Sequence, residues 1–538
     1  MVKHSGLKPI SAISLLFIAY LPGRNKYPKL YKVTMASQQA GLLEGFNETL
    51  KWTFGLINHQ GKYLTCEQFQ ARVSVGGATL RKKQVWTLEP QDNGKVAFKN
   101  YLNKYLGADK DGKVTGDSDD VDTNNNFEII TQDDGRVALK SLHGRYLNGT
   151  DDKMDCYMLE IKPEALWTIH LAIHPQINLR NVNRRTYAHY VEENGNKSIK
   201  VSEEVPWGSD AMLILEFHNG KYAIRTFNGL YLVKDGTLTE ELTDDCLYVL
   251  VFREGQVAFK DKDQLFLTAV GITATMQSRN AQVTKDELFL LEDSHPQAKF
   301  MASTGKYCSI RGNTIEVQAK QDGTQDDEIF QLEAIDRTDM SGNCKWAIRG
   351  RNKKYWQLGA GTCNIVCDAP NFSEAKSHFC IEWLGAQITM KADNGQYVLM
   401  KRNGQLSATS PDTVEDAKFV FEFINRPRLI LRCENGFVGQ KVANPQLECT
   451  RSVYDIFEVH DNKGVYRLKG KEGWWNIQAD NTFTTNGANP QDFFFELRAH
   501  TRMCIVANNG KYILGENNGV FSATAEKGTV NMKTLWEY

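Results

Sequence analysis

Short aromatic and β-branched runs recur along the chain, and most begin with an aromatic residue just after a Gly or Asn turn. Examples are "GKYLT" at Tyr63, "GRYLN" at Tyr146 and "GKYIL" at Tyr512. Gly and Asn tolerate the positive φ of a tight hairpin, and the aromatic side chain that follows can fill an interior. Runs this short, with turns this frequent, predict a chain that is nearly all β, and no sustained helical periodicity competes.

This motif occurs twelve times, at intervals of 35 to 48 residues that cluster around forty. A period of this size indicates a repeat architecture. Propeller blades and β-trefoil thirds both pack about four strands into such a unit, so the period alone leaves both open. Twelve blades would have to divide into two rings, and the Gly-His and Trp-Asp signature of the commonest blade is missing. Twelve trefoil thirds instead form four domains of ordinary size, at about 120 residues each.

We therefore expect an all-β protein of four tandem β-trefoil domains built from twelve repeats of about forty residues. Proline-containing breaks at "HPQ", "SHPQ" and "INRP" support the division. The expected domains cover residues 48–174, 175–295, 296–424 and 425–538. The connections are short and not rich in Gly or Ser, which predicts domains fixed relative to one another.

Residues 1–47 are expected to be an extension, either disordered or an unprocessed leader. Lys3 and Lys8 precede an apolar run at residues 10–21 that has the outline of a signal peptide but is too short to span a bilayer. The repeat begins only near residue 51, and Met35 is a plausible second start. The leader and several Asn-x-Ser/Thr sequons leave an alternative open, a secreted trefoil of the lectin or growth-factor type.

Composition and charge limit the classes of function that the sequence allows. The formal net charge is -1 with 24% charged residues, which argues against a nucleic-acid-binding protein, so an electrostatic partner must be met by local patches. The eleven cysteines are odd in number and irregularly spaced, which favours a reducing compartment over a disulfide framework. Nucleotide-binding, hydrolase and zinc-protease motifs are missing. We expect no enzyme activity, no metal and no cofactor.

What remains are clusters of cations in turns: Arg81-Lys82-Lys83, Arg184-Arg185, Lys401-Arg402, and the group Arg426, Arg428 and Arg432. Most surface cations are simply solvated. Several separated patches on one rigid body could, however, engage acidic surfaces on more than one partner, which converts binding into cross-linking.

From residue 54 to residue 538 the sequence resembles the fascin family, whose members are built from four β-trefoils. The similarity is carried by "FGLINHQGKYLT", "LRKKQVWTLEP", "EVPWG", "KDELFLLE", "RNGQL", "INRP", "DFFFEL" and the terminal "LWEY". The resemblance implies a non-enzymatic cytoplasmic monomer, without stable membrane insertion, that cross-links filamentous actin into tight parallel bundles of filopodia, microspikes or bristles.

The resemblance also implies residues for actin contact, and these lie in all four domains: Lys62, Arg81, Lys82, Lys83, Arg136, Arg145, Arg184, Arg185, Lys285, Lys401, Arg426, Arg432, Glu434 and Lys511. It implies two phosphorylation sites, Thr79 and Ser309. In the fourth domain this chain has Asn435, Leu514, Glu516 and Asn517 where family members carry other residues, so the site there is expected to be weakened or shifted to Lys511.

Overall fold

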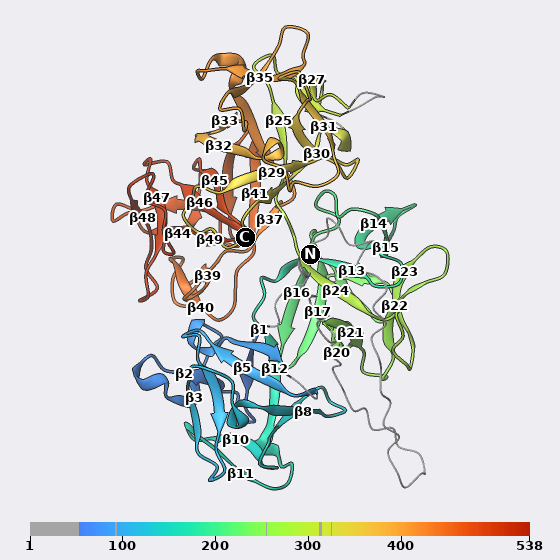
Figure 1. Cartoon of the computed structure of the whole chain (residues 1–538), viewed down its shortest axis with the longest axis vertical. Coiled ribbons are helices and arrows are strands. Elements are labelled where there is room, and N and C mark those ends of the chain that lie inside the picture. Colours follow the sequence, from blue (N-terminus) through green and yellow to red (C-terminus); the bar gives the residue numbers. More distant parts are fainter. Residues whose placement is uncertain (1–52, 92–93, 254, 311–314, 324) are drawn as a thin grey trace, which may run out of the picture. The chain divides into compact units, whose positions relative to one another are not determined.

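The computed structural model describes residues 53–91, 94–253, 255–310, 315–323 and 325–538 (Figure 1). The expected extension, residues 1–47, lies outside this part of the chain. The described residues form strands joined by turns and short 3-10 segments, without an α-helix. Accordingly, these residues include no helix with the length and apolar character needed to cross a membrane.

The first twelve strands form one sheet, drawn in blue and teal in Figure 1. They are β1 (Thr53–Ile57), β2 (Tyr63–Cys66), β3 (Val73–Gly77), β4 (Trp86–Pro90), β5 (Val96–Asn100), β6 (Tyr105–Ala108), β7 (Val114–Ser118), β8 (Phe127–Thr131), β9 (Val137–Ser141), β10 (Tyr146–Thr150), β11 (Lys153–Met158) and β12 (Leu166–Leu171). The 3-10 segments here are η1 (Phe69–Ala71), η2 (Lys82–Gln84), η4 (Thr123–Asn125) and η5 (Pro163–Ala165).

Six of these strands close a barrel, since the antiparallel pairings run from β1 through β4, β5, β8, β9 and β12 and back to β1. The remaining strands form the hairpins β2–β3, β6–β7 and β10–β11. A six-stranded barrel with three hairpins is the β-trefoil arrangement. Its core is a cluster of buried apolar residues that includes Phe54, Phe98 and Phe127.

The second twelve strands also form one sheet. They are β13 (Gln176–Asn181), β14 (Tyr187–Glu193), β15 (Asn196–Glu203), β16 (Leu213–His218), β17 (Lys221–Thr226), β18 (Tyr231–Leu232), β19 (Leu238–Thr239), β20 (Val249–Arg253), β21 (Gln256–Lys260), β22 (Phe266–Val270), β23 (Thr275–Asn280) and β24 (Phe289–Asp293), with η6 (Asp244–Cys246). The first and last strands pair here too, with Leu179 opposite Leu291.

The third set of twelve repeats the complete barrel. Its strands are β25 (Gln297–Met301), β26 (Tyr307–Ser309), β27 (Gln318–Gln321), β28 (Phe330–Ala334), β29 (Lys345–Arg349), β30 (Tyr355–Leu358), β31 (Ile365–Ala369), β32 (Phe379–Leu384), β33 (Gln387–Lys391), β34 (Tyr397–Met400), β35 (Leu406–Ser410) and β36 (Phe419–Phe423). Its 3-10 segments are η7 (Asp326–Glu328), η8 (Ala375–Ser377) and η9 (Glu415–Ala417).

The last strands form two sheets joined by a bridge between Tyr466 and Phe493. They are β37 (Arg428–Leu429), β38 (Arg432–Cys433), β39 (Gly436–Gln440), β40 (Leu447–Arg451), β41 (Phe457–Asn462), β42 (Val465–Lys469), β43 (Trp474–Ile477), β44 (Phe483–Gly487), β45 (Phe494–Ala499), β46 (Arg502–Val506), β47 (Tyr512–Gly515), β48 (Phe521–Ala525) and β49 (Trp536–Glu537). The prediction of an all-β chain of four tandem β-trefoils is confirmed.

A repeated hydrogen bond shows why the aromatic motif recurs. Trp86 Nε1 donates to the carbonyl oxygen of Leu64 at 3.1 Å, and Trp167 Nε1 donates to that of Leu147 at 3.1 Å. In both cases the acceptor directly follows the motif tyrosine. A buried indole needs a partner for its N–H group, and this bond satisfies it in these two repeats.

Candidate functional site

The cations Arg81, Lys82 and Lys83 lie on a rigid turn in the first trefoil. Gln84 ends that turn, and its buried side chain donates from Nε2 to Thr65 Oγ1 at 3.1 Å. The Arg81 N–H group donates to Gln84 Oε1 at 3.2 Å. These bonds anchor the turn to strand β2, so the three charged side chains emerge from a defined place.

All three of these side chains are exposed, as is Lys62 in the β1–β2 turn. Lys83 Nζ lies 2.6 Å from Glu67 Oε2, and this hydrogen bond raises the pKa of Lys83. Lys82 Nζ lies 5.8 Å from the centroid of the Tyr101 ring. We refer to Lys62, Arg81, Lys82 and Lys83 as the trefoil 1 cluster.

Lys62 is grouped with the other three cations because its neighbour in the chain and that of Arg81 both pack against Gly55. A Cβ added at Gly55 would come within 2.6 Å of Leu80 Cδ1 and 2.9 Å of Tyr63 Cδ1. The residue after Lys62 and the residue before Arg81 therefore pack against the same glycine. Thr79, half-exposed, precedes Leu80 in the same loop.

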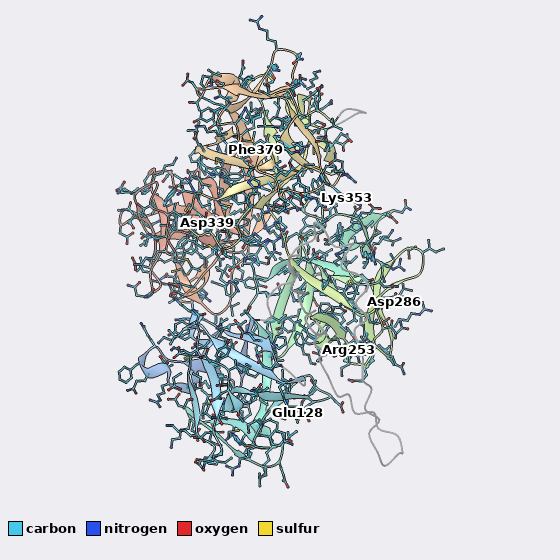
Figure 2. The ribbon with its side chains drawn as sticks, viewed as in Figure 1. Glu128, Arg253, Asp286, Asp339, Lys353 and Phe379 are labelled. Carbon is cyan, nitrogen blue, oxygen red and sulfur yellow. The ribbon has the colours of Figure 1, made fainter. Side chains whose placement is uncertain are left out.

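Arg184 and Arg185 lie on one loop of the second trefoil and Lys285 lies on another, all three are exposed, and we call these residues the trefoil 2 cluster. Asn183 Nδ2 donates to Asp286 Oδ1 at 2.6 Å, which joins the first loop to the one that carries Lys285. Arg184 donates to the carbonyl oxygen of Gly271 at 2.8 Å, which adds the β22–β23 turn. Asp286 lies beside this hairpin (Figure 2).

Four other cations that the resemblance implies, Arg136, Arg145, Lys401 and Lys511, are half-exposed, and three of them have partners that compete with an external acid. Arg136 pairs with Asp134 at 2.7 Å, Lys511 pairs with Glu526 at 2.9 Å, and Lys401 Nζ donates to Asn364 Oδ1 at 2.9 Å. Arg145 and Glu434 lie in turns and are also half-exposed.

Arg426 does not fit the expectation of a filament contact, because its residue is only 1% exposed. Its guanidinium donates to the carbonyl oxygen of Ser294 at 2.6 Å and to Ser294 Oγ at 3.1 Å, and it lies 5.6 Å from the centroid of the Tyr538 ring. Burial lowers the pKa of this guanidinium to about 10. Arg426 links segments at the ends of different trefoils and has no route to an external partner.

Arg432 also has an internal role. It contacts Glu537 Oε2 at 2.5 Å from Nε, and Arg502 NH1 lies 2.7 Å from the same oxygen. Burial on its own would raise the pKa of Glu537, but the two arginines outweigh it and hold that pKa far below its usual range. The cation of Arg432 is neutralised within the protein, so we withdraw it as a filament contact.

Ser309 does not fit the expectation of an accessible phosphorylation site. The residue ends strand β26 and is only 3% exposed, so a kinase could reach it only after local unfolding. The half-exposed Thr79 remains the accessible candidate of the two.

Many further cations belong to a structural device that sequence reasoning missed. In strand β5, Lys99 lies 5.2 Å from the centroid of the Tyr105 ring, and Tyr105 donates its hydroxyl to Glu89 at 2.7 Å. The same combination of cation, tyrosine and glutamate recurs in the second and third trefoils, as Arg180–Tyr187–Glu292, Arg225–Tyr231–Glu216, Arg349–Tyr355–Glu333 and Lys391–Tyr397–Glu382.

These triads explain two repeated features of the sequence. The cation and the tyrosine face each other across a hairpin, as in the pairs Lys99–Tyr105 and Arg225–Tyr231. The glutamate is the acid in strands such as "WTLE" and "LFLLE". A cation over a tyrosine ring whose hydroxyl is held by a carboxylate is internally satisfied. The glutamate that recurs in these strands was the sequence signal for the triads.

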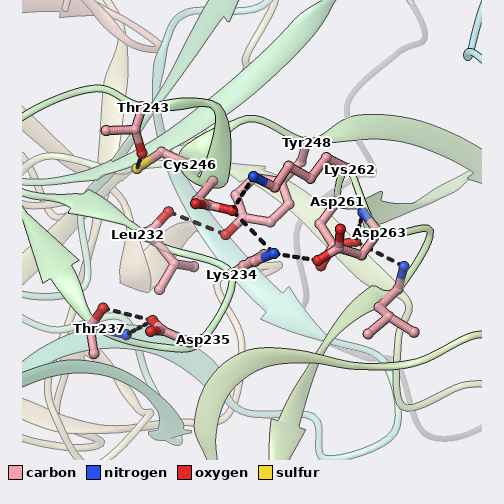
Figure 3. A network of polar contacts seen from close by, with 12 residues as sticks. Leu232, Lys234, Asp235, Thr237, Thr243, Cys246, Tyr248, Asp261, Lys262 and Asp263 are labelled. Atoms are coloured by element: carbon pink, nitrogen blue, oxygen red, sulfur yellow. Dashed lines mark hydrogen bonds and ion pairs between the residues drawn. The ribbon is translucent and has the colours of Figure 1, made fainter.

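The charged loop around Lys234 is neutralised by dense ion pairing. Figure 3 shows Lys234 between Asp245 and Asp263, with Lys262 also on Asp245 at 2.9 Å. This loop therefore offers no net cationic surface, in contrast to the trefoil 1 and trefoil 2 clusters.

All eleven cysteines are free thiols, and no group of three or more His, Cys, Asp and Glu side chains within the described ranges could hold a metal ion.

The model of the fascin domain matches residues 60–169, 177–291, 303–423 and 434–538, once in each trefoil. The chain belongs to the fascin family. Its fascin relatives include Fascin-2 of Bos taurus, which is 38% identical over 500 residues that cover 92% of this chain and 99% of that protein. Fascin of Strongylocentrotus purpuratus is 35% identical over 507 residues, with 91% and 99% covered. Fascin-3 of Homo sapiens is 23% identical, with 90% and 96% covered.

Proposed function

We propose that this protein is a non-enzymatic cross-linker of filamentous actin, acting as a monomer in the cytoplasm and in actin-rich cell projections. Membership of the fascin family across all four trefoils is the observation that carries this proposal. The free state of all eleven thiols supports a reducing compartment over the secreted lectin or growth-factor alternative.

The contacts are proposed to be the trefoil 1 and trefoil 2 clusters. Their side chains are exposed on anchored turns, whereas Arg426 and Arg432 are engaged in the interior. A filament with an acidic surface would meet each cluster by charge complementarity, and two clusters on one chain would join two filaments. Arg136, Arg145, Lys401, Glu434 and Lys511 are proposed as weaker contacts, because they are only half-exposed.

Thr79 is the proposed regulatory site. Phosphorylation would add about two negative charges beside Arg81, which would partly neutralise the trefoil 1 cluster and weaken filament binding.

Low-speed co-sedimentation with filamentous actin tests the proposal. We expect bundles to pellet at low ionic strength and to dissolve as salt rises, because exposed charge contacts are screened. If no bundles form at low ionic strength, the proposal is wrong. A parallel titration with double-stranded DNA is expected to show no comparable binding.

A further inference from the structure

Each cluster uses one of its own cations to hold a neighbouring turn that presents a large apolar side chain to solvent. In the first trefoil, Lys83 pairs with Glu67, and Glu67 begins the turn that carries Phe69, which is 77% exposed. In the second, Arg184 donates to the carbonyl oxygens of Ala269 at 3.0 Å and Gly271 at 2.8 Å. The next residue, Ile272, is fully exposed.

The turn that carries Phe69 is closed and strained. The Glu67 N–H group donates to the Arg72 carbonyl oxygen at 2.8 Å, and the Arg72 N–H group donates to the Phe69 carbonyl oxygen at 3.2 Å. Gln70 and Ala71 have φ of 53° and 46°, a left-handed conformation that is unfavourable for residues with a Cβ. Ala71 is buried, so the turn is held from below while Phe69 points outward.

The turn that carries Ile272 is built in the same way. Ala274, with φ of 53°, is buried and ends the turn, as Ala71 does in the first trefoil. In both trefoils, a buried alanine in the left-handed region anchors the turn, a cluster cation ties it down, and an apolar side chain stands at the tip.

A single exposed apolar residue needs no explanation. Two turns of the same construction, each hydrogen-bonded to a cation cluster, do need an explanation. We propose that Phe69 and Ile272 are apolar anchors of the two filament-binding surfaces. Each would insert into a small apolar hollow on actin, while the surrounding cations meet an acidic rim. This inference rests on the proposed function.

Protein interfaces of this kind concentrate their affinity in a few apolar or aromatic residues and arginines, and the surrounding polar residues exclude water. The cations alone would give contacts that salt screens almost completely. An apolar anchor adds affinity that salt does not remove.

The test compares Phe69→Ser and Ile272→Ser with matched controls, Leu159→Ser and Val442→Ser, whose side chains are 75% and 95% exposed and which belong to neither cluster. Phe69→Leu keeps an apolar tip. Circular dichroism and thermal unfolding verify the fold of each variant. Binding is measured by high-speed pelleting with filamentous actin, and bundling by low-speed pelleting.

We expect either single Ser variant to lose bundles while it still binds filaments through the other surface. The double variant should bind about tenfold or more weakly, since a buried Phe or Ile side chain contributes at least that much. The dependence of affinity on salt should keep its slope, and Phe69→Leu should retain most of the bundling.

The outcomes separate the two proposals. If the wild type forms no bundles, the proposed function fails. If the wild type forms bundles and the Phe69→Ser/Ile272→Ser double variant matches the Leu159→Ser/Val442→Ser double variant, the anchor inference alone is overturned. It is overturned as well if the Ser variants lose binding to phosphatidylserine vesicles but not to filaments.

Discussion

The cations at Arg81–Lys83 and those at Arg426 and Arg432 occupy opposite environments. The first group is exposed on a 3-10 turn held by the buried Gln84 side chain. The second group has internal partners: Arg426 is buried and donates to the Ser294 carbonyl oxygen, and the half-buried Arg432 pairs with the Glu537 carboxylate. A charge taken out of water must find internal partners, whereas an exposed charge keeps its attraction for an external one.

It follows that the same residue type has different consequences in the two places. Removal of a buried cation leaves its partners unsatisfied and should lower the free energy of unfolding. Removal of an exposed cation should leave stability nearly unchanged and weaken binding.

The largest effect is expected for Arg426→Ala. The substitution leaves the Ser294 carbonyl oxygen without its donor and opens a cavity against Tyr538, which should lower the free energy of unfolding by about 3–5 kcal/mol. Urea unfolding measures this change. Arg426→Lys should cost less, because it keeps a charge and most of the volume. An Arg426→Ala protein as stable as the wild type would contradict the buried role.

A pH effect should come from His174, near Arg426 and Arg432. Its Nδ1 accepts from the Gln176 N–H group at 3.2 Å and its Nε2 lies 3.2 Å from the Ile430 carbonyl oxygen, so the neutral ring is the form that fits. Burial lowers its pKa from 6.5 to about 3, with Glu537 opposing and both arginines reinforcing the shift.

Between these two pKa values the unfolded chain binds more protons than the folded protein, so stability should fall as pH drops below 6.5. At pH 5 the loss should be about 2 kcal/mol relative to pH 7, from about 1.4 kcal/mol per unit. His174→Asn, which keeps an acceptor but does not titrate, should show a smaller loss. Urea unfolding across pH 4.5–7.5 measures both proteins, and identical pH profiles would contradict the assignment.

Substitution of Arg81, Lys82 and Lys83 together by Gln should reduce bundling about tenfold at low salt, because the trefoil 1 cluster loses most of its charge. The melting temperature should change little, since these side chains are exposed. Low-speed actin pelleting measures the effect. The matched control replaces Lys110, Lys113 and Lys153, three exposed lysines of the same trefoil, and should bundle like the wild type. Equal losses in both triple variants would indicate a nonspecific effect of net charge.

The smallest effect is expected for Thr79→Glu, which adds one negative charge beside the cluster. Bundling should fall a few-fold at low salt and converge with the wild type as salt screens the charge. Thr79→Val and Thr123→Glu serve as controls for the lost hydroxyl and for a distant exposed charge. A Thr79→Glu protein that bundles like the wild type would remove the proposed switch.

The local sequence pattern was sufficient to predict the fold. The spacing of Tyr63, Tyr105, Tyr146 and their equivalents predicted the repeats, because each repeat must bury its own aromatic residue after its own turn. The cluster at Arg81–Lys83 was also visible, since consecutive cations on a short turn cannot all be buried.

The roles of Arg426, Arg432 and Ser309 could not be predicted in this way. Ser294 and Glu537 are distant in sequence from Arg426 and Arg432, and the burial of Ser309 depends on what packs against β26. Only folding decides whether each of these side chains meets protein or water. Phe69 and Ile272 were missed for the same reason, since nothing local distinguishes an exposed apolar residue from the many buried ones.

The chain therefore encodes its trefoils through short-range periodicity, in which hairpin turns and aromatic spacing act within about forty residues. The division of its cations into buried partners, tyrosine-bound cations and exposed clusters depends on long-range packing, because the cost of removing a charge from water is determined by everything that surrounds it.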